Sequence, residues 1–220
     1  IESRGLGDVY KRQIKNFKKA KKIPGFLSQE EVLRILNSAI KVGKNKLEKT
    51  RNKALIEILY ASGMRVSELV SLRKSLFIGT PEIILIKGKG NKERMVPISK
   101  LAISAVKKYL AELKKTNIAL YESDFLFPSK SKNGYLNRER FFLIIKKIAR
   151  FAGLNPRYVS PHKIRHAFAS HLLSNGADLR VIQTLLGHKN LSTTEIYTHI
   201  LDKKMITVSY THLTLPTIRS

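Results

Sequence analysis

The sequence predicts an α+β fold, mainly α with a small antiparallel β-sheet. Apolar residues recur at helical spacing over most of the 220 residues, whereas residues 82–98 alternate apolar and polar side chains around a Gly-rich centre. Hydrophobic residues make up 43% of the chain, which is enough for one sizeable core. No apolar run approaches the length that spans a membrane.

The first half of the chain predicts two helices, a helical turn and a hairpin. In SQEE, Ser28 and Glu31 have the spacing of a capping box, which opens a helix over 28–40. After a lysine-rich polar stretch, RNKALIEILYASG predicts a second helix that stops at Gly63, and SELVSL predicts a short helical turn. The alternating stretch that follows, EIILIKGKGNKERMVPI, predicts a β-hairpin.

The second half of the chain predicts helices only. The whole chain is expected to form one compact domain that is mostly helical with one small sheet. Helical spacing returns over 99–115, 137–152, 161–174, 178–186 and 192–206. The basic segment 14–27 contains Pro-Gly near its end and is interpreted as the remnant of an interdomain linker.

Both ends of the chain are expected to be foreign to the protein. DVYKRQ, residues 8–13, can be encoded by GATGTGTATAAGAGACAG, and one frame of the reverse complement encodes VSYTH, residues 208–212. The shared DNA resembles the transposase adapter used in making sequencing libraries. We therefore interpret 1–13 and 208–220 as adapter read-through that carries no information about the fold.

A large excess of positive charge is the strongest signal in the composition. Lysine and arginine number 42 against 16 acidic residues, a net charge of +26, and the isoelectric point is about 10.3. This excess favours a polyanionic partner, namely DNA, RNA or an anionic membrane, over a merely solvated surface. The chain has no cysteine, which excludes disulfides and thiolate metal sites.

The segment HKIRH fits two kinds of site. His162 and His166 are one helical turn apart, as zinc ligands are, but Lys163 stands where zinc proteases have a glutamate. Alternatively, His162 and Arg165 share a helix face and together suit an anionic phosphate oxygen. His166 and His171 are then interpreted as partly buried or surface histidines.

Three other segments carry residues suited to a phosphate. In GMRVSEL, Arg65 follows a glycine turn and Glu68 could hold its guanidinium, although a surface ion pair has the same spacing. In KGKGNKER, Lys89 lies at the hairpin tip, where it could reach a DNA groove and donate a proton. His188 precedes Tyr197, whose phenol (pKa ~10) needs a base or positive charge to act as a nucleophile and is otherwise a packing residue.

Together these residues favour phosphodiester chemistry without a bound metal or cofactor. Attack by a phenol adds negative charge at phosphorus, which metal enzymes neutralise with cations held by carboxylates. The chain has four aspartates, so a two-metal site is poorly supplied, whereas arginine and histidine donors give the same electrostatic stabilisation.

These motifs resemble the tyrosine recombinase (phage integrase) family, and most closely the bacterial Xer site-specific recombinases of the XerC/XerD group. The resemblance covers nearly all of residues 23–205, through ASGMRVSELVSL, KGKGNKERMVPI, SPHKIRHAFASHLLSNGADLRVIQTLLGH and LSTTEIYTH. It implies the catalytic-domain fold of that family, with the catalytic domain over 28–207. It also implies six catalytic residues: Arg65, Lys89, His162, Arg165, His188 and Tyr197.

The resemblance further implies how the six residues divide the work. Tyr197 would be the nucleophile that forms a 3′-phosphotyrosine link and releases a 5′-hydroxyl. His162 would be the base that takes the tyrosine proton, and Lys89 would protonate the departing 5′-oxygen. The other three, Arg65, Arg165 and His188, would bind the phosphate oxygens, with Glu68 in support.

The resemblance implies partners and a setting as well. Family members carry an N-terminal core-binding domain and a C-terminal helix that docks on a neighbouring protomer, and we expect both to be missing here. The partners would be double-stranded DNA and homologous or paralogous protomers, in a tetramer on two DNA sites in the bacterial cytoplasm, at the nucleoid. Chromosome dimer resolution is the expected role, with three alternatives: mobile-element integration, type IB topoisomerase-like relaxation and a non-catalytic DNA-binding module.

Overall fold

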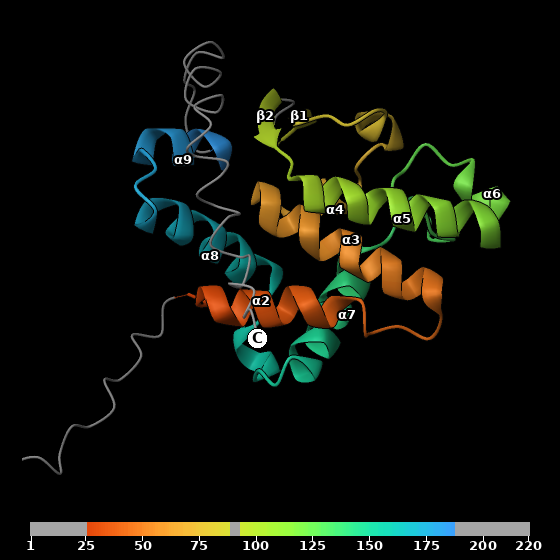
Figure 1. Cartoon of the computed structure of the whole chain (residues 1–220). Coiled ribbons are helices and arrows are strands. Elements are labelled where there is room, and N and C mark those ends of the chain that lie inside the picture. The colour runs from red at the N-terminus through yellow and green to blue at the C-terminus, as the bar shows by residue number, and fades with distance from the viewer. Residues whose placement is uncertain (1–25, 89–92, 188–220) are drawn as a thin grey trace, which may run out of the picture.

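A computed structural model describes residues 26–88 and 93–187 of the chain (Figure 1). The predicted helix over 192–206 and the two predicted adapter segments lie outside the described residues. The elements in chain order are α2 (Gln29–Ala39), α3 (Lys46–Ser62), α4 (Val66–Val70), the 3₁₀ turn η2 (Lys74–Phe77), β1 (Ile83–Lys87), β2 (Glu93–Pro97), α5 (Lys100–Thr116), α6 (Ile118–Tyr121), α7 (Arg138–Phe151), the 3₁₀ turn η4 (Pro156–Tyr158), α8 (Pro161–Ser174) and α9 (Leu179–Leu185).

The first helix begins where its capping box predicts. The Ser28 hydroxyl accepts a hydrogen bond from the Glu31 backbone N–H at 3.2 Å, and the Glu31 carboxylate accepts one from the Ser28 N–H at 2.8 Å. Helix α2 then buries Val32, Ile35 and Leu36, which recur at helical spacing.

The second helix, α3, is longer than predicted. It begins at Lys46 because Asn45 caps it, accepting a hydrogen bond from the Glu48 N–H at 2.9 Å. Its first turn has a single apolar residue, Leu47, which is too few to show a helical period, and the lysine-rich stretch was therefore wrongly interpreted as lying outside the helix. The helix ends as predicted at Gly63, whose φ of 57° is left-handed.

The predicted hairpin and the later helices within the described residues are confirmed. Strands β1 and β2 pair antiparallel with Leu85 opposite Met95, and alternate residues of both strands turn inward. Helices α5, α7, α8 and α9 lie within one or two residues of their predicted bounds. The short helix α6 was not predicted, because four residues are too few to show a period.

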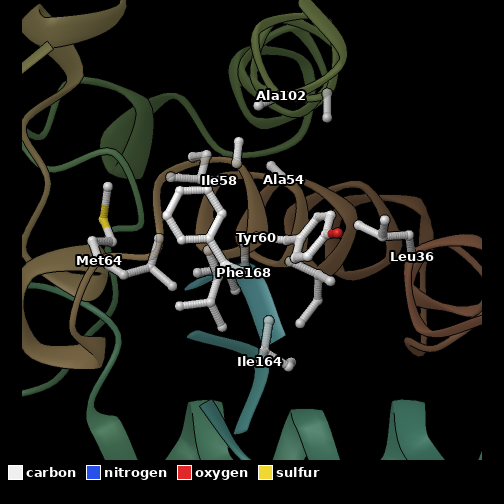
Figure 2. Close-up of a cluster of buried hydrophobic side chains, with 14 of the residues drawn as sticks. Leu36, Ala54, Ile58, Tyr60, Met64, Ala102, Ile164 and Phe168 are labelled. Carbon is white, nitrogen blue, oxygen red and sulfur yellow. The ribbon is translucent and has the colours of Figure 1, made fainter. Parts of the chain in front are cut away.

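Helix α3 forms the centre of the fold. It packs along α5 and also contacts α2 and α8, so its middle is buried on every side (Figure 1). Figure 2 shows Phe168 and Ile164 of α8 inserted among the apolar side chains around α3. This packing fixes α8, the helix that carries HKIRH, against the end of α3.

A buried tyrosine–histidine pair extends the same core. The Tyr60 hydroxyl lies 3.0 Å from His171 Nδ1, and burial raises the pKa of Tyr60 to about 12. His171 is buried and His166 is exposed on the same helix. His166 is therefore at the surface, as predicted, and His171 is more completely buried than predicted.

Among the residues that the structure describes, no helix has the length and apolar character needed to cross a membrane.

Replacing Gly63 by Ala should destabilise the fold more than the same change at Gly79. Both glycines have a left-handed φ, 57° and 76°, which costs an L-residue about 1–2 kcal/mol. A Cβ on Gly63 would also lie 2.3 Å from Phe168 Cδ1, whereas nothing lies within 4 Å of one on Gly79. We expect Gly63→Ala to cost about 2 kcal/mol more than Gly79→Ala in urea denaturation, because the buried ring must shift. Equal losses would show that Phe168 does not constrain this turn.

Candidate active site

The buried arginine of α8 links two helix ends. Arg165 Nη1 donates to the backbone oxygen of Gly63 at 2.6 Å, and Nη2 donates to the backbone oxygen of Leu186 at 2.6 Å. Carbonyls at helix C-termini have no partner within their own helix. Arg165 therefore satisfies carbonyls just beyond α3 and α9 and holds both ends against α8.

Arg65 stands directly before α4 and is held by Glu68. The Glu68 carboxylate accepts one hydrogen bond from the Arg65 backbone N–H at 2.7 Å and one from its Nη1 at 3.2 Å. The Glu68 side chain is only 7% exposed and that of Arg65 is 38% exposed. The alternative of a surface ion pair is wrong for Glu68, because its carboxylate is buried.

A third arginine, Arg94 of β2, was missed by the sequence analysis. Its Nη1 and Nη2 donate to the two carboxylate oxygens of Glu68 at 2.8 and 2.6 Å, and its Nε donates to the backbone oxygen of Leu185 at 3.0 Å. The one available signal is the hairpin alternation, which gives Arg94 the same inward orientation as Val96. An arginine at an inward position needs a buried partner.

The three guanidinium groups converge beside the end of α9. Gly187 has a φ of 73°, and a Cβ built on it would lie 3.4 Å from Arg94 Nη1 and 3.5 Å from Arg65 Nη1. Burial, with the charges of Arg65 and Arg94, lowers the pKa of Arg165 to about 10, so it stays charged at neutral pH. Three arginines against one glutamate leave an excess of positive charge, which suits a phosphate.

The charge of Glu68 is maintained by its donors. Burial alone would raise the pKa of its carboxyl, but the hydrogen bonds from Arg94 and from the Arg65 backbone outweigh burial, so the pKa lies below its ordinary value. Glu68 is therefore an anion at neutral pH, and it offsets part of the repulsion among the arginines.

Of the other predicted site residues, the described structure includes only His162. His162 lies in the first turn of α8 with its side chain exposed, and no described hydrogen bond connects it to the arginines. Lys89, His188 and Tyr197 lie outside the described residues, although Gly187 directly precedes His188. Within 26–88 and 93–187, no group of three or more His, Asp or Glu side chains could hold a metal ion.

Comparison with known proteins identifies the family. The sequence model described as the phage integrase family matches residues 25–204. This chain belongs to the phage integrase family.

Relatives in this family include tyrosine recombinase XerD from two bacteria. XerD of Rhizobium meliloti (strain 1021) is 48% identical over 192 residues, which cover 86% of this chain and 61% of that protein. XerD of Agrobacterium fabrum (strain C58) is 46% identical over 208 residues, covering 86% and 62%. The chain thus spans less than two thirds of the length of these phage integrase relatives.

Solved structures of the family confirm the predicted tyrosine recombinase catalytic-domain fold. The XerA recombinase superposes with a TM-score of 0.63 at 31% identity, covering 87% of this chain and 66% of XerA. XerH bound to its difH substrate before cleavage gives a TM-score of 0.65 at 34% identity, covering 80% and 50%.

Replacing Glu68 by Gln should cost about 3 kcal/mol of unfolding free energy near neutral pH, because it leaves the buried Arg94 without its counter-charge. The folded-state pKa of Glu68 is lowered, so its stabilisation is complete above the ordinary value of 4.5 and is lost as pH falls through the lowered value. Urea denaturation at a series of pH values should therefore show the wild-type advantage shrinking in acid.

The matched control is Glu93→Gln, at a glutamate that is 45% exposed and 3.7 Å from Lys87. An exposed pair of this kind contributes less than about 1 kcal/mol, so this variant should unfold like the wild type. Equal effects of the two variants would contradict the buried role of Glu68.

Proposed function

We propose that this chain is the catalytic part of a Xer-type site-specific DNA recombinase that cuts and rejoins DNA through a 3′-phosphotyrosine intermediate. One observation carries the proposal: Glu68 holds Arg65 where Arg94, Arg165 and the backbone just before His188 also meet. The family match and the 48% identity to a XerD support it.

Arg65 and Arg165 would stabilise the charge that develops on the attacked phosphate. Arg65 is partly exposed, so its guanidinium is open to a phosphate outside the fold. Each Arg165 nitrogen that donates to a carbonyl carries a second hydrogen, which would be free for a non-bridging oxygen. Because Glu68 and the two carbonyls hold both groups beforehand, no reorganisation is needed during the reaction.

The remaining steps are proton transfers and covalent catalysis. Tyr197 attacks phosphorus and displaces the 5′-oxygen; His162 accepts the tyrosine proton, and Lys89 donates one to the leaving oxygen. His188 donates a hydrogen bond to the phosphate. The phosphotyrosine link keeps the energy of the broken bond, so the 5′-hydroxyl of a partner strand reverses the step without ATP, metal or cofactor.

The proposed partners are double-stranded DNA and other recombinase protomers, assembled as a tetramer on two sites. The XerH structure is a complex with its difH substrate, which supports DNA as the partner here. The similarity to XerD favours chromosome dimer resolution by a bacterial cytoplasmic protein at the nucleoid.

The test is covalent capture of DNA by Tyr197. The chain is incubated with a library of randomised duplexes, each nicked so that cleavage is irreversible, and adducts are isolated in denaturant. We expect the wild type to form adducts and Tyr197→Phe to form none while still binding DNA. The control Tyr158→Phe changes an exposed tyrosine outside the proposed site and should match the wild type.

The outcomes separate the candidate functions. An undiminished adduct in Tyr197→Phe means that another residue is the nucleophile. DNA binding without any wild-type adduct means that the chain is a binding module. Strand exchange between two copies of a selected duplex distinguishes a recombinase from an enzyme that only relaxes DNA.

A further inference from the structure

Arg94 is a buried cation to which the proposed function gives no role. It is only 8% exposed, and all three of its guanidinium nitrogens donate to groups of the protein. Two of these bonds go to Glu68 and the third goes to the backbone oxygen of Leu185. Because its nitrogens are all bonded to the protein, Arg94 would affect the reaction through the residues that it binds.

We propose that Arg94 is the positioning residue of this active site: it fixes Arg65 through Glu68, and it fixes the backbone that leads to His188 through Leu185. The inference rests on the proposed function, which gives Arg65 and His188 their roles at the phosphate.

The first connection runs through the Glu68 carboxylate. Arg94 binds both carboxylate oxygens, at 2.8 and 2.6 Å, whereas the side chain of Arg65 reaches only one, at 3.2 Å. A planar guanidinium that binds both oxygens fixes the plane of a carboxylate. The Arg65 backbone N–H also donates to this carboxylate, at 2.7 Å, and the paired bonds from Arg94 add the constraint on its plane and so on the place of the Arg65 guanidinium.

The second connection runs to the end of α9. Arg94 donates to the oxygen of Leu185 and Arg165 to that of Leu186, so two cations satisfy carbonyls at this helix terminus. The following residue, Gly187, lies so close that a Cβ on it would be 3.3 Å from Arg94 Cδ. Arg94 therefore limits where the chain can pass immediately before His188.

The third connection is the strand itself. Arg94 pairs with Ile86 across the hairpin, and β2 packs against α9. A two-stranded hairpin has little stability of its own. Arg94 binds Glu68 of α4 and Leu185 of α9. It thereby holds the β1–β2 hairpin, whose connecting loop contains Lys89, against both helices.

The experiment uses Arg94→Lys in the 220-residue chain, with a duplex selected by covalent capture. Lysine keeps the charge but lacks the planar pair of N–H donors that fixes the carboxylate, so Arg65 should be misplaced. A misplaced catalytic group lowers rates by about ten- to a hundredfold. We expect single-turnover adduct formation to slow by at least about tenfold, while the Kd for the duplex stays within about threefold of wild type.

A neutral substrate distinguishes positioning from a general structural role. In a duplex with a methylphosphonate at the cleaved position, one charged oxygen is replaced by a methyl group, so less depends on Arg65. The ratio of wild-type to Arg94→Lys rates should then fall to within about threefold. A variant that is merely less well folded would be slowed equally on both substrates.

The matched control is Arg73→Lys, at an exposed arginine that forms an ion pair with Asp124 at 3.4 Å. It should leave adduct formation unchanged on both duplexes. Wild-type rates for Arg94→Lys would overturn the proposal, and an equal slowing on both duplexes would overturn its connection through Glu68 to Arg65.

Hydrogen–deuterium exchange provides a readout that does not need cleavage. Arg94→Lys should speed exchange at the Arg65 N–H, which is bonded to Glu68, and at the last turn of α9. Unchanged exchange at both places overturns the positioning role. Absence of a wild-type adduct overturns the proposed function instead, and exchange still decides what Arg94 does.

If Arg94→Lys does not fold, Arg94→Met replaces it, because a long apolar side chain fills a similar buried volume while removing the bonds to Glu68 and to Leu185. The same substrate ratio and the same exchange sites then decide the outcome.

Discussion

The site depends on one buried carboxylate that neutralises an otherwise repulsive group of cations. Glu68 accepts four hydrogen bonds, two from Arg65 and two from Arg94, which is as many as a carboxylate readily takes. Burying such a group is costly unless its bonds are complete. Burial would raise the pKa of Glu68, but the hydrogen bonds from Arg94 and Arg65 lower it, so the carboxylate stays charged and can hold two arginines at fixed places.

Backbone oxygens supply the hydrogen-bond acceptors for the arginine that Glu68 does not bind. Arg165 has no carboxylate among its hydrogen-bond partners in the described structure and instead donates to the oxygens of Gly63 and Leu186. These acceptors exist because α3 and α9 both end close to it, α3 at a left-handed glycine. The packing of α8 on α3 that Figure 2 shows is therefore also what brings Arg165 to its acceptors. The apolar core and the polar site are parts of one arrangement.

Local sequence patterns predicted most of the helices and strands. They could not predict contacts between residues far apart in the sequence. Ser28 and Gly63 mark helix ends through bonds to near neighbours, so the sequence alone locates them. The holding of Arg65 by Glu68 was one of two interpretations that their three-residue spacing allowed, the other being a surface ion pair. Arg94 lies 26 residues from Glu68 and 91 from Leu185, and no periodicity reports contacts at that separation. The alternation of residues along β2 places Arg94 on the inward side but does not show that Glu68 is its partner.

Because the cluster consists of arginines and not of histidines or lysines, its positive charge does not change near neutral pH. Even with burial and two neighbouring cations against it, Arg165 keeps a pKa of about 10, far above neutral pH. Glu68 is held ionised at the other end of the scale. Between those limits neither group changes charge, so the field that they present to a phosphate is constant across the physiological range. Groups outside this cluster must then supply whatever proton transfer the chemistry requires, which separates the task of binding a phosphate from the task of moving protons.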